Sequence, residues 1–164
     1  MTRSKTDSGK EKPSAYNKAL GLLVRREQSE RELKAKLSRG GYASEEAEAA
    51  VDALKANEYQ SDSRFAELLA RSRAANGYGP RRIAAELKSH GIEDAEIAAA
   101  LAELECDWLD LARRQLQRRY GRKPAAEVQE RARRAAFLLR RGFDGSTVRV
   151  LTRADIGDPG EEFD

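Results

Sequence analysis

The chain has 164 residues, of which 36% are charged and 40% hydrophobic, and its formal net charge is +3. A chain this polar cannot bury one large core. We therefore expect several small cores between amphipathic helices packed in series. A single cysteine excludes an intramolecular disulfide and is typical of a reducing compartment. The absence of an 18-residue apolar run and of a signal peptide predicts a cytoplasmic protein, with a disordered N-terminal tail over residues 1–13.

Residues 14–58 are predicted to form the first of three helical repeats. Apolar residues keep helical spacing over residues 16–23. Ser29, three residues before a glutamate, begins a capping box that starts a second helix. Gly41 is expected to end that helix, and Ser44 to cap the third.

Residues 59–107 repeat the same order of signals. Phe65, Leu68 and Leu69 form the apolar stripe of a first helix. The Gly79–Pro80 pair then places proline at the first position of a second helix. A glycine stop at Gly91 follows, with Glu93 or Asp94 as the expected N-cap of a third helix.

Residues 108–156 form the third predicted repeat. Trp108, Ala112, Leu116 and Tyr120 share one helical face. A Gly and Pro break at residues 121–124 follows, and a second helix then runs to Gly142. The expected N-cap of its last helix is Asp144 or Ser146.

The stop signal at Gly41 recurs after 50 residues at Gly91 and after a further 51 at Gly142. A leucine lies four residues before each glycine and a bulky apolar residue directly follows it. These signals predict an all-α fold, an elongated, curved array of three tandem three-helix repeats.

The charges are unevenly distributed. Residues 108–153 contain thirteen Arg and Lys against four acids, whereas residues 92–107 contain six acids and no base. An acidic tail is expected at residues 157–164. Clustered arginines suit an anionic partner such as nucleic acid, although arginine is also a good helix former that simply adds solubility.

No arrangement of residues points to catalysis. The single histidine, His90, precedes a helix stop, and the acidic surroundings of Cys106 disfavour a thiolate. No His and Cys spacing suits a metal, and no glycine-rich phosphate loop follows a strand. We therefore expect a protein that is not an enzyme, has no cofactor and takes no small-molecule substrate.

Three motifs are similar to those of the RecX family of regulatory proteins. Residues 19–37 contain LLVRREQSERELKAKL, which resembles the family pattern LLxRREHSRxELxxKL, with Gln28 in place of His and Glu30 in place of Arg. DSRFA at residues 62–66 and GPRRIAAEL at 79–87 resemble the second family motif. LRRGFD at residues 139–144 resembles the closing motif, and the likeness covers about residues 15–152.

The resemblance implies a modulator of the RecA recombinase that binds in the helical groove of the RecA–DNA filament. There, such proteins suppress filament extension, ATP hydrolysis, strand exchange and co-protease activity, without a cofactor. The expected RecA and DNA contacts come from the first two motifs and from the basic third repeat: Arg25, Arg26, Arg31, Lys34, Arg81, Arg82, Arg113, Arg114, Arg118, Arg133 and Arg134.

Two other functions remain open from the sequence. A free-standing protein that binds DNA phosphates without sequence preference would bind tightly without any recombinase, and its binding would weaken with salt. A helical-repeat adaptor for other proteins would have no effect on DNA. Aromatic residues are sparse in the basic block, so base-specific recognition is not expected.

Overall fold

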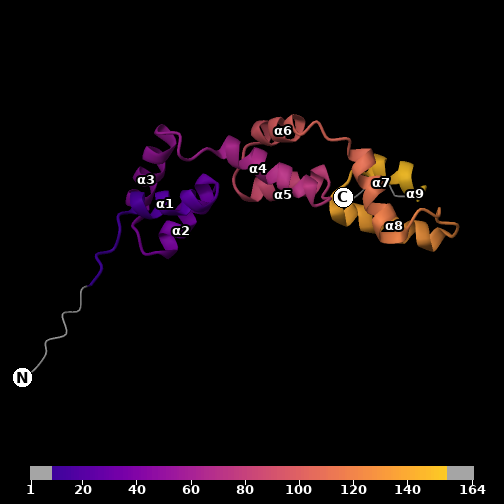
Figure 1. Ribbon diagram of the computed structural model, residues 1–164, viewed down its shortest axis with the longest axis horizontal. Helices are drawn as coiled ribbons and strands as arrows, with labels where there is room; N and C mark the ends of the chain where they lie inside the picture. The colour runs from indigo at the N-terminus through magenta and orange to yellow at the C-terminus, as the bar shows by residue number, and fades with distance from the viewer. Residues whose placement is uncertain (1–8, 155–164) are drawn as a thin grey trace, which may run out of the picture. The chain divides into compact units, whose positions relative to one another are not determined.

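The computed structural model describes residues 9–154, which contain nine α-helices and no strand (Figure 1). The all-α prediction is therefore confirmed for this part of the chain. The first repeat belongs to one compact unit, residues 1–61, and the second and third repeats to another, residues 62–164. Most of the predicted N-terminal tail and all of the acidic tail at 157–164 lie outside the described residues.

The first repeat consists of α1 (Ala15–Arg25), α2 (Glu30–Arg39) and α3 (Ser44–Ala56). Its small core is formed by one apolar stripe from each helix, and the side chains of Ala19, Leu33 and Leu54 are fully buried. Because each helix is amphipathic, the polar faces remain in solvent.

The second repeat consists of α4 (Asp62–Ala75), α5 (Pro80–Ser89) and α6 (Asp94–Glu103). Phe65 and Ile83 are central to its core. The assignment of Leu68 to the core stripe was wrong, because this side chain is exposed.

The third repeat consists of α7 (Trp108–Tyr120), α8 (Val128–Arg141) and α9 (Gly145–Thr152). Leu138, Phe143 and Val148 are buried in its core. The break after α7 is longer than in the second repeat, since α8 starts only at Val128. Trp108 packs against the cores of both the second and the third repeat, which are otherwise separate.

The predicted glycine stops are confirmed, and all three have the same geometry. Gly41, Gly91 and Gly142 have φ values of 84°, 75° and 93°, in the left-handed region that glycine adopts without strain. The residue after each glycine donates its N–H to the carbonyl of the leucine five residues earlier, over 3.1 to 3.2 Å. This is the Schellman motif, and it folds Tyr42, Ile92 and Phe143 back onto the helix just ended.

The helix starts agree less well with the sequence. Ser29 caps α2 through a 3.1 Å bond from the N–H of Glu32, and Pro80 is the first residue of α5, as expected. Ser44, however, is the first residue of α3, and the N-cap is Ala43. Glu93 and Asp144 occupy N-cap positions, but neither side chain makes the capping hydrogen bond.

None of the helices within residues 9–154 is long and apolar enough to span a membrane.

Candidate protein and nucleic-acid interface

Two of the four cations expected to make contacts in the first repeat, Arg26 and Lys34, are held by acids of the same repeat. Lys34 forms an ion pair with Glu30 over 2.8 Å, and Lys55 forms a second ion pair with the same carboxylate over 2.9 Å. Hydrogen bonds from these two lysines lower the pKa of the Glu30 carboxyl. Glu30 thus compensates two of the positive charges of this repeat.

Glu32 plays the same part for two further cations. It forms an ion pair with Arg26 and lies 2.9 Å from Lys36. Burial raises the pKa of Glu32, but the hydrogen bonds from Arg26 and Lys36 outweigh it, so that the pKa is lowered overall. Arg25 and Arg31, the other two expected contact residues of this repeat, are exposed.

Gln28, which replaces the family's usual histidine, is a structural residue. Its side chain is 2% exposed, donates to the carbonyl of Leu22 over 2.9 Å and accepts from Lys36 over 2.6 Å. Its backbone carbonyl accepts a bond from Gln60 at the end of the repeat. The residue therefore holds the turn between α1 and α2 rather than facing a partner.

The 79–87 part of the second motif begins where the second and third repeats meet. The N–H of Gly79 donates to the carbonyl of Arg141 over 2.7 Å, and the N–H of Arg81 donates to that of Gly142 over 2.9 Å. Helix α5 has no side-chain N-cap. Its first turn is instead capped by carbonyls at the end of α8, so that the positive end of one helix dipole meets the negative end of the other.

Close backbone approach explains the glycines of this joint. A Cβ on Gly79 would lie 2.4 Å from the carbonyl of Gly142, and one on Gly142 would lie 2.4 Å from the Cβ of Arg82. A Cβ on Gly77 would lie 2.3 Å from the amide of Gln115. Only glycine fits at these three positions without movement of its neighbours.

Arg141 completes the joint, and the sequence marked it only as part of the closing motif at residues 139–144. Its guanidinium donates to the carbonyl of Asn76 over 3.1 Å and to Gln115 over 2.8 Å. It also lies 4.5 Å from the centre of the Tyr78 ring. Its partners on the second repeat are up to 65 residues away in sequence, so only a signal of long-range pairing would have found it.

Arg81 and Arg82 are therefore partly engaged within the protein. Arg81 lies 3.3 Å from Asp144, and Arg82 donates to the carbonyl of Arg140 over 3.4 Å and stacks 4.1 Å from the Tyr78 ring. Both side chains remain exposed, so they also present charge to solvent at the joint.

In the third repeat, four of the five expected contact residues are exposed: Arg113, Arg114, Arg118 and Arg133. The fifth, Arg134, is buried, with only 8% of the residue exposed. It pairs with Glu130, donates to the carbonyl of Lys123 over 2.9 Å and lies 5.1 Å from the centre of the Tyr120 ring. Its long side chain spans the repeat and fixes the loop after α7.

Residues 9–154 contain one cysteine and one histidine, and the structure shows the surroundings of both. No group of three or more His, Cys, Asp and Glu side chains in this range is placed to hold a metal ion. Burial raises the pKa of the Cys106 thiol, which is the direction expected from its acidic surroundings. His90 is the C-cap residue of α5, and its ring contacts that of Phe65 in a tilted arrangement, with ring centres 4.8 Å apart.

The fold and these contacts define a class: a tandem array of three-helix domains whose third member is basic. Family models for the first, second and third three-helix domains of RecX match residues 15–54, 61–101 and 105–150. The chain therefore belongs to the RecX family of regulatory proteins.

Individual relatives agree with this assignment. The regulatory protein RecX of Stenotrophomonas maltophilia (strain K279a) is 48% identical over 141 residues, which cover 86% of each chain. That of Xanthomonas oryzae pv. oryzae (strain PXO99A) is 45% identical, over 86% of this chain and 87% of the relative.

Solved structures show the same fold. A crystal structure of regulatory protein RecX matches 85% of this chain and 70% of its own, with a TM-score of 0.71 and 25% identity. The crystal structure of RecX from Lactobacillus salivarius matches 85% of this chain and 92% of its own, with a TM-score of 0.70.

Proposed function

We propose that this protein binds in the helical groove of the RecA–DNA filament and inhibits filament extension, ATP hydrolysis, strand exchange and co-protease activity. It would thereby modulate homologous recombination, DNA repair and the SOS response. The observation that carries the proposal is that all three RecX domains are matched in order along the chain. The mechanism is occupancy of the groove, without catalysis or a cofactor.

The distribution of charge supports a division of work between the repeats. Four cations of the first repeat, Arg26, Lys34, Lys36 and Lys55, are paired with its own acids, so this repeat is suited to shape-based contact with protein. The third repeat exposes Arg114, Arg118 and Arg133 and holds thirteen bases against four acids over residues 108–153. This repeat is suited to the phosphates of the DNA inside the filament.

The first experiment is a titration of the DNA-dependent ATPase of RecA with this protein at two salt concentrations. A fall in rate at substoichiometric protein supports the proposal, because one bound molecule then affects several RecA subunits. An unchanged ATPase rate at stoichiometric protein overturns it.

A triple charge reversal tests the part assigned to the third repeat. The substitutions Arg113→Glu, Arg114→Glu and Arg118→Glu are expected to weaken inhibition of the ATPase by tenfold or more. A matched control carries Lys18→Glu, Arg39→Glu and Arg71→Glu, three exposed positions outside the expected contacts. If the third-repeat variant folds and still inhibits the ATPase as the unsubstituted protein does, these three arginines do not contact the filament.

The alternative is a free-standing protein that binds DNA without sequence preference, and the excess of cations in the third repeat favours it. It predicts a salt-dependent shift of naked DNA in a gel together with no effect on RecA. The proposed function predicts inhibition of RecA whether or not naked DNA is bound tightly.

A further inference from the structure

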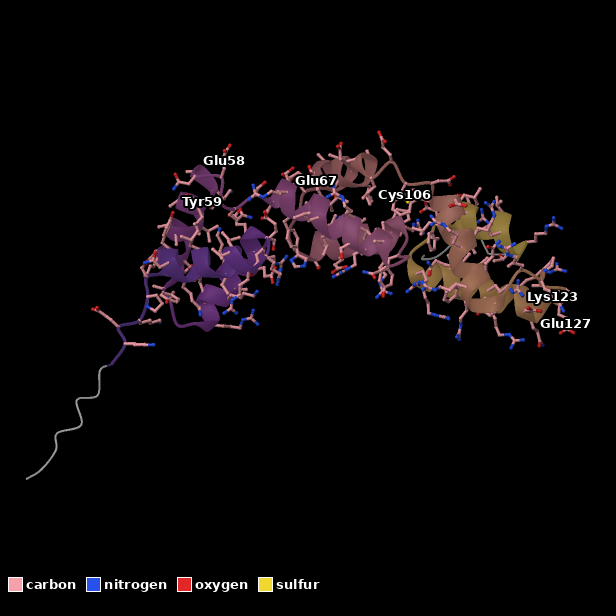
Figure 2. All side chains as sticks on the ribbon, viewed as in Figure 1. Glu58, Tyr59, Glu67, Cys106, Lys123 and Glu127 are labelled. Atoms are coloured by element: carbon pink, nitrogen blue, oxygen red, sulfur yellow. The ribbon has the colours of Figure 1, made fainter. Side chains whose placement is uncertain are left out.

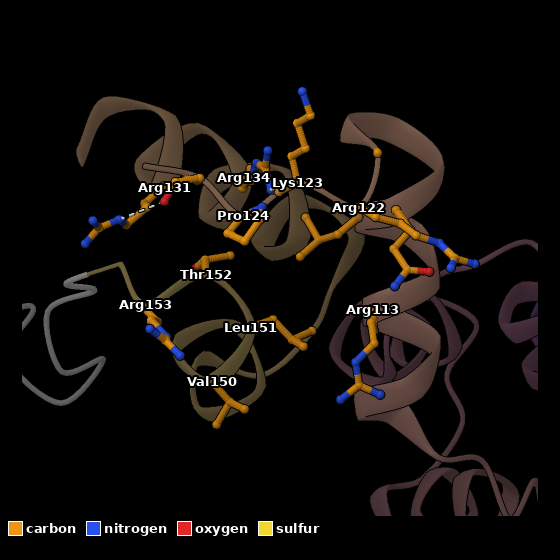
Figure 3. A pocket seen from close by; sticks show the side chains of 14 residues that line it. Arg113, Arg122, Lys123, Pro124, Arg131, Arg134, Val150, Leu151, Thr152 and Arg153 are labelled. Atoms are coloured by element: carbon orange, nitrogen blue, oxygen red, sulfur yellow. Dashed lines mark hydrogen bonds between the residues drawn. The ribbon is translucent and has the colours of Figure 1, made fainter. Parts of the chain in front are cut away.

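A cleft of about 450 Å³ lies within the third repeat. It is bordered by the end of α7, the 121–127 loop, the start of α8 and the end of α9 (Figure 3). Among its lining residues are six bases and no acid; the bases are Arg113, Arg122, Lys123, Arg131, Arg134 and Arg153. Such a lining creates a concentrated positive potential in a concave site.

Few of these charges are compensated by the protein. Within residues 9–154, Arg122, Lys123 and Arg153 have no carboxylate within ion-pair distance. Arg113 lies 3.8 Å from Asp110, at the outer limit of an ion pair. Figure 2 places Lys123 and Glu127 on the loop after α7, where both side chains are exposed. The cleft therefore carries an excess of positive charge that an anion would neutralise.

Two arginines at the base of the cleft are held in place by the protein. Arg131 donates to the carbonyls of Ala125 and Ala126, over 3.3 and 2.9 Å, and so fixes the loop. Arg134 is buried, and its Nε has no hydrogen-bond partner in the described part of the chain. A buried donor without a partner is rare in folded proteins.

The cleft also has an apolar wall. Val150, which is 64% exposed, lines the cleft together with Leu151 and Pro124. In Figure 3 these side chains lie between Arg153 on one side and Arg113 on the other. An anion with an attached apolar surface would use both parts, and a nucleotide within a single strand has this combination, since its base is not hidden by a complementary strand.

We propose that this cleft binds a phosphodiester group of single-stranded DNA, with the attached nucleoside against Val150 and Leu151. The proposal rests on the function proposed above in one respect: the RecA–DNA filament would supply the single-stranded DNA. The binding site itself requires only DNA, so it is tested without RecA.

The test compares two variants with the same change in charge. Arg122→Glu with Arg153→Glu reverses two cations of the cleft. Arg119→Glu with Arg140→Glu reverses two exposed cations of the same repeat that do not line it. Binding of each full-length protein to a labelled oligothymidylate is followed by fluorescence anisotropy between 50 and 200 mM salt, and circular dichroism checks the fold.

The cleft variant is expected to lose about tenfold or more in affinity, whereas the control loses about threefold or less. Because each phosphate contact contributes about 0.7 to the slope of log K against log salt for single strands, the slope should become shallower by about 1.4 in the cleft variant alone. Equal losses in the two variants would show a diffuse charge effect and overturn the proposal, as would unchanged affinity in the cleft variant.

Val150→Ser tests the apolar wall without a change in charge. Binding of the oligothymidylate should weaken by about threefold, and binding of a duplex of the same length should not change, because stacked bases are out of reach. Equal effects on the two DNAs contradict the nucleoside contact.

Two further measurements separate the possible occupants and the two proposals. If the cleft variant keeps its DNA affinity but loses binding of an acidic peptide with the sequence of residues 155–164, the cleft is a carboxylate site and the proposal is wrong. Inhibition of the RecA ATPase is measured separately. A loss of DNA affinity confined to the cleft variant supports the inference even when RecA is unaffected.

Discussion

The first and third repeats end their second helices with the same turn but use it differently. At Gly41, the nearest atom to an added Cβ would be the mobile end of Lys12 at 3.2 Å. At Gly142, the backbone of Arg82 in the second repeat would be only 2.5 Å away. The same local signal therefore stops a helix in both repeats and, in the third, also forms a docking surface.

The two repeats also differ in how they treat charge. In the first repeat, Glu30 and Glu32 each hold two bases. In the third repeat, Asp110 is the only acid within ion-pair distance of Arg113 and Arg114 in the described residues, and Arg122 has none. In the first repeat, the acids thus pair with bases of the same repeat and stabilise it, whereas the third repeat leaves bases available to an anionic partner.

The largest expected effect comes from alanine at the two glycine turns. Gly142→Ala should destabilise the second unit by about 2–4 kcal/mol, because the left-handed conformation and the contact with Arg82 both resist a Cβ. Gly41→Ala should cost about 1–2 kcal/mol, from conformation alone. Urea unfolding of each variant measures the difference, and equal costs would contradict the docking role of Gly142.

Arg141→Ala tests the same difference between the first and third repeats. Position 141 corresponds to Gly40 of the first repeat, which has no side chain that could form such contacts. The loss of hydrogen bonds to Asn76 and Gln115 should destabilise the second unit by about 1–3 kcal/mol. Thermal unfolding followed by the fluorescence of Trp108, which packs between the two cores, reports this directly. Arg140→Ala, at an exposed neighbouring position, is the control and should change little.

Acid should weaken the first repeat through Glu30 and Glu32. Their carboxyl pKa values are lowered in the folded state, so they stabilise the fold above their ordinary pKa of 4.5, and this contribution disappears as the pH falls through the lowered values. The free energy of unfolding of the first unit in urea should therefore fall as the pH is lowered below 4.5. Glu32→Gln should reduce stability at pH 7 by about 1 kcal/mol or less, since Arg26 is exposed and its charge is screened by solvent. The same substitution should make the stability depend less on pH.

The smallest effect on stability is expected at Arg25. Because this side chain is exposed, Arg25→Ala should change the free energy of unfolding by no more than about 0.5 kcal/mol. A clear loss of RecA inhibition by this stable variant would show that the first repeat also contacts the filament. Inhibition equal to that of the unsubstituted protein would leave the third repeat as the main source of contacts.

Local signals were enough to predict much of the fold. The leucine and glycine pairs ending at Gly41, Gly91 and Gly142 act within six residues, and all three formed the expected turn. Local signals were less useful at helix starts, where Ala43 rather than Ser44 is the N-cap. There the backbone turn that precedes the helix sets its start, and the side-chain preference for a cap is overridden.

The candidate site was harder to predict, because its geometry depends on distant segments. Arg134 has the sequence neighbours of a surface residue, yet the loop at Lys123 and the Tyr120 ring cover it. The basic cleft joins residues 113–117 of α7 with residues 150–152 of α9, which lie more than thirty positions later, and no periodicity relates them. Charge density predicted that the third repeat matters, but not which of its arginines face a common space.

The carbonyls that cap α5 have a consequence for how such proteins change over evolutionary time. Repeat arrays commonly lengthen or shorten by duplicating or deleting whole units, which requires each unit to end in the same way. Here α5 begins on the carbonyls of Arg141 and Gly142, so the second repeat is completed by the third. A new unit inserted between them would have to present the same glycine surface on one side and accept it on the other. Copy number at this boundary is therefore constrained by two main-chain hydrogen bonds.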